Sequence, residues 1–173
     1  MTAALVGLVG FLISPWLHGL AVQAGGDRKF HLGLTCPRCG EDGPGSISCV
    51  CGRLRWREAV LGLGVGLSAA GMSATLGWGG VLAAHLAMVA VTAILIVTDI
   101  DHFRIPNRIL YPGFAVCFVL LVLGTALDGD GGNIPRAVAG GAIYFGLLLL
   151  VFLAARGEGF GFGDVKLAAL LGL

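Results

Sequence analysis

The feature that most constrains this chain is a series of long apolar segments. A helix needs about 20 apolar residues to cross the roughly 30 Å of hydrocarbon in a bilayer. Segments of that kind cover residues 4–22, 59–97, 109–127 and 137–155, and the second has the length of two spans with a turn at 77–80. A shorter apolar segment follows Asp164 and reaches Leu173. We therefore predict an all-α polytopic membrane protein with about five full transmembrane helices plus a truncated sixth.

The composition excludes a water-soluble globular domain. Only 12% of the 173 residues are charged and 57% are hydrophobic, whereas about a quarter of the residues are charged in a soluble domain. Thirty glycines suit membrane helices that pack closely through small residues. We expect the lipid bilayer as a partner, and we expect no nucleic acid.

The distribution of basic residues predicts the orientation. Lysine and arginine gather in the first, third and fifth connections between apolar segments, and only Arg136 stands elsewhere. Because positive charge marks the cytoplasmic side, these three connections are predicted to be cytoplasmic and the N-terminus to lie outside. The chain then comprises a first transmembrane helix at 1–22, a short Cys-rich cytosolic loop at 23–58 and a membrane core at 59–173. It is expected to be a multi-pass protein of the inner (plasma) membrane.

The N-terminal segment has a second interpretation. The sequence from Val22 to Ala24 resembles a signal-peptidase site after an apolar stretch. No Lys or Arg precedes that stretch, whereas a secretory signal normally opens with positive charge. A retained first span is therefore preferred.

The first of two acidic motifs spans residues 98–107 and reads TDIDHFRIPN. Its Asp99 stands where an apolar segment is expected to meet the cytoplasm. Ionisable groups at membrane depth are costly, and they usually face a protein interior or a wet cavity. The alternative is that Asp99 and Asp101 simply end the helix in the headgroup region.

The second acidic motif spans residues 157–166 and reads GEGFGFGDVK. Its alternating glycines allow a sharp bend and the close approach of another backbone. Asp164 follows them at the start of an apolar helix, where a negative charge suits the helix dipole. A simpler interpretation is a Gly-rich turn with Asp164 as the N-cap. A phosphate-binding loop is less favoured, because the motif lacks a Gly-Lys-Ser/Thr ending.

Taken together, the two motifs predict a pair of carboxyl groups that act in one site. Asp99 and Asp164 fall at the cytoplasmic ends of different spans, so helix packing could bring them within reach of one another. Two carboxylates in one site cannot both ionise easily, so one keeps a proton near neutral pH. The ionised partner can take a proton from water while the other donates one to a carbonyl oxygen. The pair therefore predicts peptide hydrolysis by general acid–base catalysis, for which no cofactor is needed.

Four of the five cysteines lie in the predicted cytosolic loop. Cys36 and Cys39 have the spacing of a zinc knuckle, whereas Cys49 and Cys51 are separated by one residue, which is less usual for a structural site. A reducing cytoplasm favours structural zinc over disulfides, with reduced thiols or a redox pair as the alternative. Disulfides are expected if the loop is outside. Cys117 is predicted to be a small buried hydrophobe, and the four histidines are assigned no role.

The two acidic motifs resemble those of the prepilin peptidases, also called type IV leader peptidases, and their archaeal preflagellin-peptidase relatives. The family's marks are an Asp followed seven residues later by Pro and then Asp or Asn, and a GxGD motif that continues to Lys. The matching residues here are Asp99, Pro106, Asn107, Gly161, Gly163, Asp164 and Lys166. By this match Asp99, and not Asp101, is the first catalytic aspartate and Asp164 is the second, while the other five support the substrate or the active site.

The resemblance implies an aspartic endopeptidase with its peptidase core at 59–173. Such an enzyme removes short basic leader peptides from type IV prepilin or pseudopilin precursors at the cytoplasmic face, in pilus assembly or protein secretion. Many members also methylate the new N-terminus with S-adenosylmethionine, but the short cytosolic loop argues against that activity here. Relatives have a further span beyond the GxGD motif, which points to a short variant or a fragment. A homodimer is left open.

Two other functions would use the same residues differently. A non-catalytic zinc-binding membrane assembly factor would need the cysteines alone. A small proton- or cation-coupled transporter would use Asp99 and Asp164 as an ion site. Neither function requires both acidic motifs to occur together, so the protease is the preferred interpretation.

Overall fold

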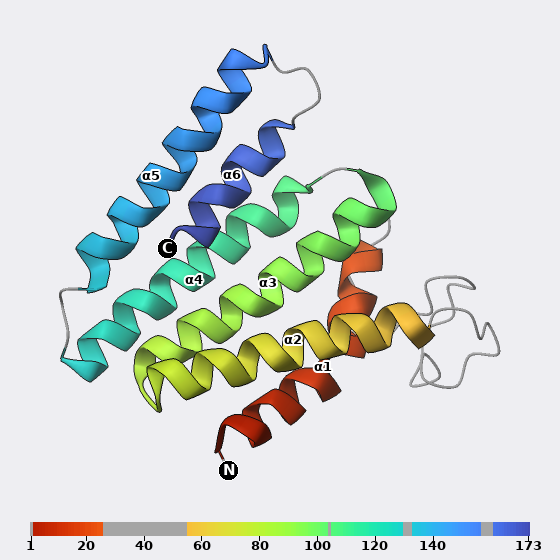
Figure 1. The fold of residues 1–173 in the computed structure, drawn as a ribbon, viewed down its shortest axis with the longest axis vertical. Coiled ribbons are helices and arrows are strands. Elements are labelled where there is room, and N and C mark those ends of the chain that lie inside the picture. The colour runs from red at the N-terminus through yellow and green to blue at the C-terminus, as the bar shows by residue number, and fades with distance from the viewer. Residues whose placement is uncertain (1, 26–54, 104, 130–132, 157–160) are drawn as a thin grey trace. The chain divides into compact units, whose positions relative to one another are not determined.

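The computed structural model describes residues 2–25, 55–103, 105–129, 133–156 and 161–173. Its described helices are α1 (Thr2–Gly25), α2 (Arg55–Leu76), α3 (Gly80–His102), α4 (Asn107–Asp128), α5 (Asn133–Ala154) and α6 (Phe162–Leu171) (Figure 1). All of them except α6 are long and apolar enough to cross a membrane. Among the described residues there is no strand. The predicted all-α polytopic architecture is confirmed.

The helix ends follow glycine and proline. α2 stops before Gly77, whose φ of 69° suits a residue without a side chain, and α3 begins at Gly80, so the turn predicted at 77–80 is confirmed. α4 begins after Pro106, which occupies the N-cap position with extended backbone, and it ends at Gly129 in the left-handed conformation. The predicted loop at 23–58 lies mostly outside the described residues.

The chain forms two compact units, which share the continuous helix α3. The first contains Met1–Gly77 and Val89–Phe103, and the second contains Trp78–Met88 and Arg104–Leu173. In the first unit α1 and α2 pack against each other along surfaces of small residues. A Cβ at Gly7 would lie 2.9 Å from the carbonyl oxygen of Gly66, and a Cβ at Gly62 would lie 2.7 Å from Oγ of Ser14. The close approach explains part of the high glycine content.

The later part of α3 completes the core of the first unit. Leu17 of α1, Val65 of α2 and Ala93 of α3 form a buried cluster. Partly buried apolar side chains surround the cluster, namely Leu61, Val89, Ala90 and Ile94. Each helix therefore turns one stripe inward and leaves the rest of its apolar surface exposed, as expected for helices in lipid.

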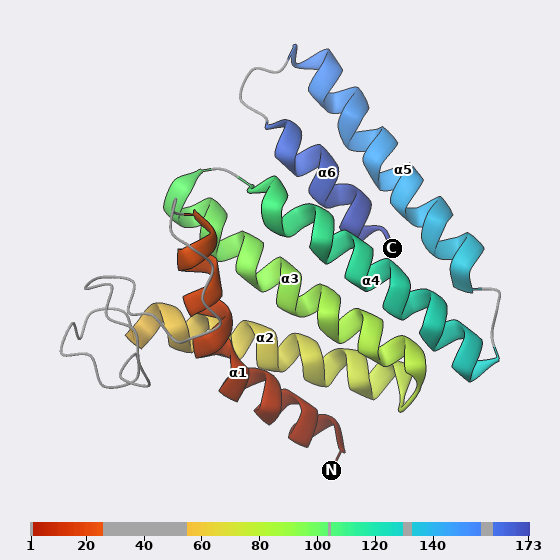
Figure 2. The same ribbon diagram turned by 180° about the vertical axis from the view of Figure 1, so that it is seen from behind.

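In the second unit α6 lies between α4 and α5, as two opposite views agree (Figures 1 and 2). α5 and α6 again pack through small residues, because a Cβ at Gly141 would lie 3.0 Å from the carbonyl oxygen of Ala169. Ala84 of α3, Leu121 of α4 and Ala137 of α5 form the buried cluster of this unit. The short helix α6 is therefore packed among full-length helices.

Asp128 connects the C-terminal end of α4 to the start of α3 through hydrogen bonds. The Asp128 carboxylate accepts hydrogen bonds from the backbone N–H groups of Gly80 at 2.8 Å and Val81 at 3.1 Å. Two of the N–H groups that lack partners at a helix start are thus satisfied by a neighbouring helix. Gly80 and Gly124 also meet backbone to backbone. The start of α3 and the end of α4 therefore adjoin in this unit.

Candidate active site

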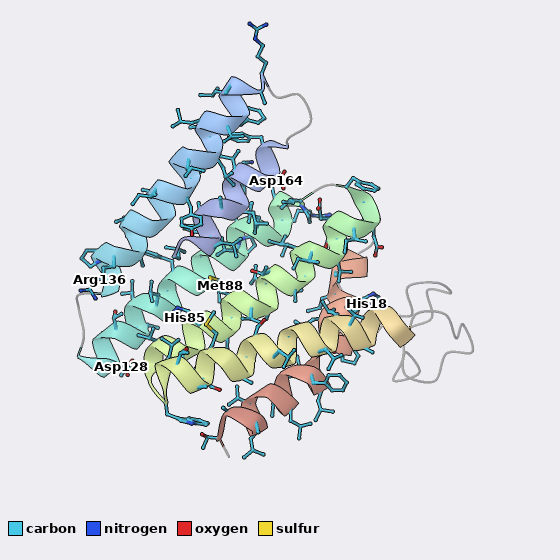
Figure 3. All side chains as sticks on the ribbon, in the orientation of Figure 1. His18, His85, Met88, Asp128, Arg136 and Asp164 are labelled. Carbon is cyan, nitrogen blue, oxygen red and sulfur yellow. The ribbon has the colours of Figure 1, made fainter. Side chains whose placement is uncertain are left out.

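The two acidic motifs meet in the second unit through Asn107 and Lys166. The Lys166 ammonium, on α6, donates a hydrogen bond to Oδ1 of Asn107, the first residue of α4, over 3.1 Å. This contact lies at the opposite end of α4 from Asp128, as the positions of Asp164 and Asp128 in Figure 3 make visible. The starts of α4 and α6 therefore share one end of the unit.

Gly163 makes a second contact between the motifs. A Cβ built on Gly163 would lie 3.1 Å from Cβ of Ile105, the residue before Pro106. Such a distance is tighter than nine in ten real Cβ contacts, so this glycine lets the start of α6 lie close to the side chain of Ile105. The role predicted for Gly163, to let another backbone come close, stays a prediction, and the neighbour found here is the side chain of Ile105.

Two aromatic rings flank the Lys166 ammonium. Its Nζ lies 5.2 Å from the ring centroid of Tyr111 on α4 and 5.1 Å from that of Phe162 on α6. Both distances are within the range of cation–π attraction. The ammonium is therefore in contact with an amide oxygen and two rings, and Lys166 as a whole is partly buried.

Asp164 lies in the first turn of α6, where the helix dipole favours a carboxylate. Gly161 is the N-cap residue, and Asp164 is three residues further on. The Asp164 carboxylate reaches back and accepts a hydrogen bond from the Gly161 N–H at 3.3 Å. The Asp164 side chain thus helps to cap the helix from the third helical position. The simpler interpretation, in which Asp164 is itself the N-cap residue, is wrong, because the N-cap residue is Gly161.

Asp99 lies in the last turn of α3, and its side chain is exposed. Its backbone carbonyl accepts the N–H of Phe103 at 2.7 Å, which closes the helix end. Phe103 is 88% exposed and has a φ of 50°, a left-handed conformation that is strained for a bulky residue. Asp99 belongs to the first unit and Asp164 to the second. The pairing of their carboxylates therefore stays a prediction.

The predicted zinc ligands Cys36, Cys39, Cys49 and Cys51 lie outside the described residues. Within the described part of the chain, no three His, Cys, Asp or Glu side chains gather in a way that could hold a metal. Cys117 is buried and free, as predicted for a small apolar residue. His18 is buried in α1, and the His85 ring contacts the Val81 carbonyl oxygen.

Ile105, Tyr111 and Phe162 were not among the site residues predicted from the sequence. The spacing of both aromatic residues could have predicted their contacts. Tyr111 follows Asn107 by four residues, and Phe162 precedes Lys166 by four. Residues four apart lie on one face of a helix. The contact of Ile105 with Gly163 depends on how α6 packs against the residues before α4, which no local pattern shows.

A known protein family matches the part of the chain that contains these contacts. The sequence model of the type IV leader peptidase family matches residues 86–173, which is just over half of the chain. The match covers Asp99 and Asp164 together with all the contacts between the two motifs. No curated protein and no solved structure matches the chain.

Proposed function

Because the chain belongs to the type IV leader peptidase family, a family of membrane proteases, we propose that it is an aspartic endopeptidase whose catalytic residues are Asp99 and Asp164. Its substrates are type IV prepilin-like or pseudopilin precursors, and cleavage takes place at the cytoplasmic face of the inner membrane.

One observation carries the proposal, the hydrogen bond between Lys166 and Asn107. Asn107 belongs to the motif that starts with Asp99, and Lys166 belongs to the motif that contains Asp164. Only five residues separate Asp99 from Ile105, which contacts Gly163. A short stretch of chain therefore links Asp99 to Ile105, which packs beside the residue that precedes Asp164. This arrangement supports a shared site and gives neither a zinc protein nor a transporter any specific support.

The proposed mechanism uses a water molecule between the two carboxyl groups. The ionised aspartate accepts a proton from this water while the water oxygen attacks the scissile carbonyl carbon. The protonated aspartate donates its proton to the carbonyl oxygen, and the pair then returns a proton to the leaving amine. Gly161 and Gly163 leave the approach to Asp164 without side-chain bulk. Lys166 and Asn107 act as positioning residues that fix α6 against α4.

The proposed side of the membrane rests on charge. The third connection carries Arg104 and Arg108, and the fifth carries Arg156, with Lys166 just beyond it. The contacts of Asn107 and Gly163 bring together the starts of α4 and α6, which follow these connections in the sequence, and positive charge at a membrane surface favours the cytoplasmic side. The opposite end, with Asp128, has only Arg136 nearby in the sequence.

We propose structural zinc at the four loop cysteines, and we do not extend the proposal to S-adenosylmethionine-dependent methylation.

The test is leader removal from a co-expressed prepilin, followed by gel mobility and N-terminal sequencing. Asp99→Asn and Asp164→Asn should each abolish processing, because each removes an ionisable group from the pair. Asp101→Asn is the matched control, since this acid stands two residues from Asp99 and should leave processing intact. Normal processing by both Asp99→Asn and Asp164→Asn, at wild-type levels of inserted protein, would refute the protease proposal.

A further inference from the structure

A small pocket in the second unit, separate from both acidic motifs, is lined by three side chains with metal-binding atoms. His85 and Met88 come from α3, where Figure 3 shows them, and Cys117 comes from α4. The spacing of His85 and Met88 places them on one face of α3. The rest of the lining is apolar and consists of Ala84, Leu121 and Leu173. An imidazole, a thioether and a thiol thus line one pocket between two membrane spans, where polar groups are costly and generally have a function.

The His85 ring is oriented by a backbone carbonyl group. Its Nδ1 lies 2.9 Å from the carbonyl oxygen of Val81. A carbonyl oxygen can only accept a hydrogen bond, so Nδ1 carries the proton and the neutral ring has its lone pair on Nε2. Metal-binding histidines are characteristically oriented in this way, by a backbone carbonyl at the other ring nitrogen.

The pocket is sized for an ion and not for an organic ligand. Its free volume of about 10 Å³ is roughly that of one water-sized particle. Cys117 is 3% exposed and is a free cysteine. Its sulfur is therefore free to bind an ion in the protein interior. A thiol and a thioether together favour a soft ion, whereas magnesium and calcium require oxygen ligands that this lining lacks.

From these observations we propose that His85, Met88 and Cys117 bind one Cu(I) ion. Zinc shares the imidazole and thiolate ligands but does not ordinarily use a thioether, whereas Cu(I) accepts both sulfur types. The thiol of Cys117 loses its proton to solvent as the sulfur–copper bond forms. The resulting thiolate and the monovalent ion are neutral together, so the pair avoids the cost of an isolated charge in the membrane.

The experiment must first remove the other thiols. In a variant with Cys36, Cys39, Cys49 and Cys51 all changed to Ser, the purified protein in detergent is titrated anaerobically with Cu(I) held by bicinchoninate. We expect it to take one Cu(I) per chain from the chelator. X-ray absorption should show sulfur and nitrogen neighbours.

Three further substitutions in that background decide the assignment. Cys117→Ser should abolish the binding, and Met88→Leu, which conserves volume, should weaken it at least about tenfold. Met72→Leu on α2 is the matched control and should change nothing. Helical circular dichroism and a single elution peak verify that each variant is folded. Equal Cu(I) uptake with and without Cys117, or no uptake by the folded parent, overturns the proposal.

Discussion

The ammonium of Lys166 donates a hydrogen bond to the side-chain oxygen of Asn107, 59 residues earlier in the chain, over 3.1 Å. This contact joins the start of α6 to the start of α4, and therefore the two motifs that the family match covers. Tyr111 and Phe162 flank the same ammonium. The contacts among these four residues lead to specific expectations for the proposed protease.

Loss of the Lys166 ammonium should slow leader cleavage. Lys166→Met keeps the stem but removes the hydrogen bond to Asn107, so the first turn of α6, which carries Asp164, loses its tie to α4. A charge-assisted hydrogen bond at a partly exposed site corresponds to about a tenfold effect on rate. Lys166→Arg keeps a cation that can donate to Asn107 and stack on the rings, and it should retain more activity. Equal cleavage rates for Lys166→Met and the wild type would contradict a positioning role.

Tyr111 should act through its ring face and not through its hydroxyl. Tyr111→Phe preserves the cation–π contact and should keep near-normal cleavage, whereas Tyr111→Leu should lower kcat about two- to fivefold, in line with the strength of such contacts at exposed sites. KM should change little, because the ring positions Lys166 and not the substrate. Steady-state kinetics on a prepilin in detergent measures both constants. A loss in Tyr111→Phe as large as that in Tyr111→Leu would exclude the cation–π explanation.

Gly163 should tolerate little added volume. Gly163→Val would push its side chain into Ile105, whose Cβ is 3.1 Å from the position of the new Cβ. A displacement of about 1 Å at a catalytic group can cost on the order of 100-fold in rate, so cleavage should fall by roughly that factor. Ile105→Ala should partly restore the Gly163→Val enzyme. Gly64→Ala on α2 is the control, because nothing lies within 4 Å of its added methyl group. Failure of Ile105→Ala to rescue would show that another contact limits Gly163.

Asp128 should matter for stability and not for cleavage. Asp128→Ala leaves the Gly80 and Val81 N–H groups at the start of α3 without their carboxylate acceptor. The melting temperature in detergent should therefore fall, and less so for Asp128→Asn, which keeps an acceptor oxygen. The cleavage rate at a temperature well below the transition should be unchanged, since Asp128 lies at the opposite end of α4 from the Asn107–Lys166 contact. A melting temperature unaffected by Asp128→Ala would remove the capping role.

Much of the fold was predictable because lipid imposes a simple length rule. The five spans follow from apolar runs of about 20 residues, and Gly77 and Pro106 mark helix ends through their own backbone preferences. Of the candidate site, Asn107 and Lys166 were recognisable in the two motifs. The partners of these residues were not. Ile105 against Gly163 and Asp128 against Gly80 are contacts between segments distant in sequence, and they depend on packing that no local pattern encodes.

The most direct test of the central claim is the proximity of residues 99 and 164. Cys is introduced at both positions in a variant whose five native cysteines are Ser, and membranes are treated with a short bifunctional thiol reagent. Mass spectrometry of the digested protein should show an intramolecular link between residues 99 and 164. The matched pair, Asp128→Cys with Asp164→Cys, should show none. The account is contradicted if the 99–164 link is absent while both thiols react singly with the reagent.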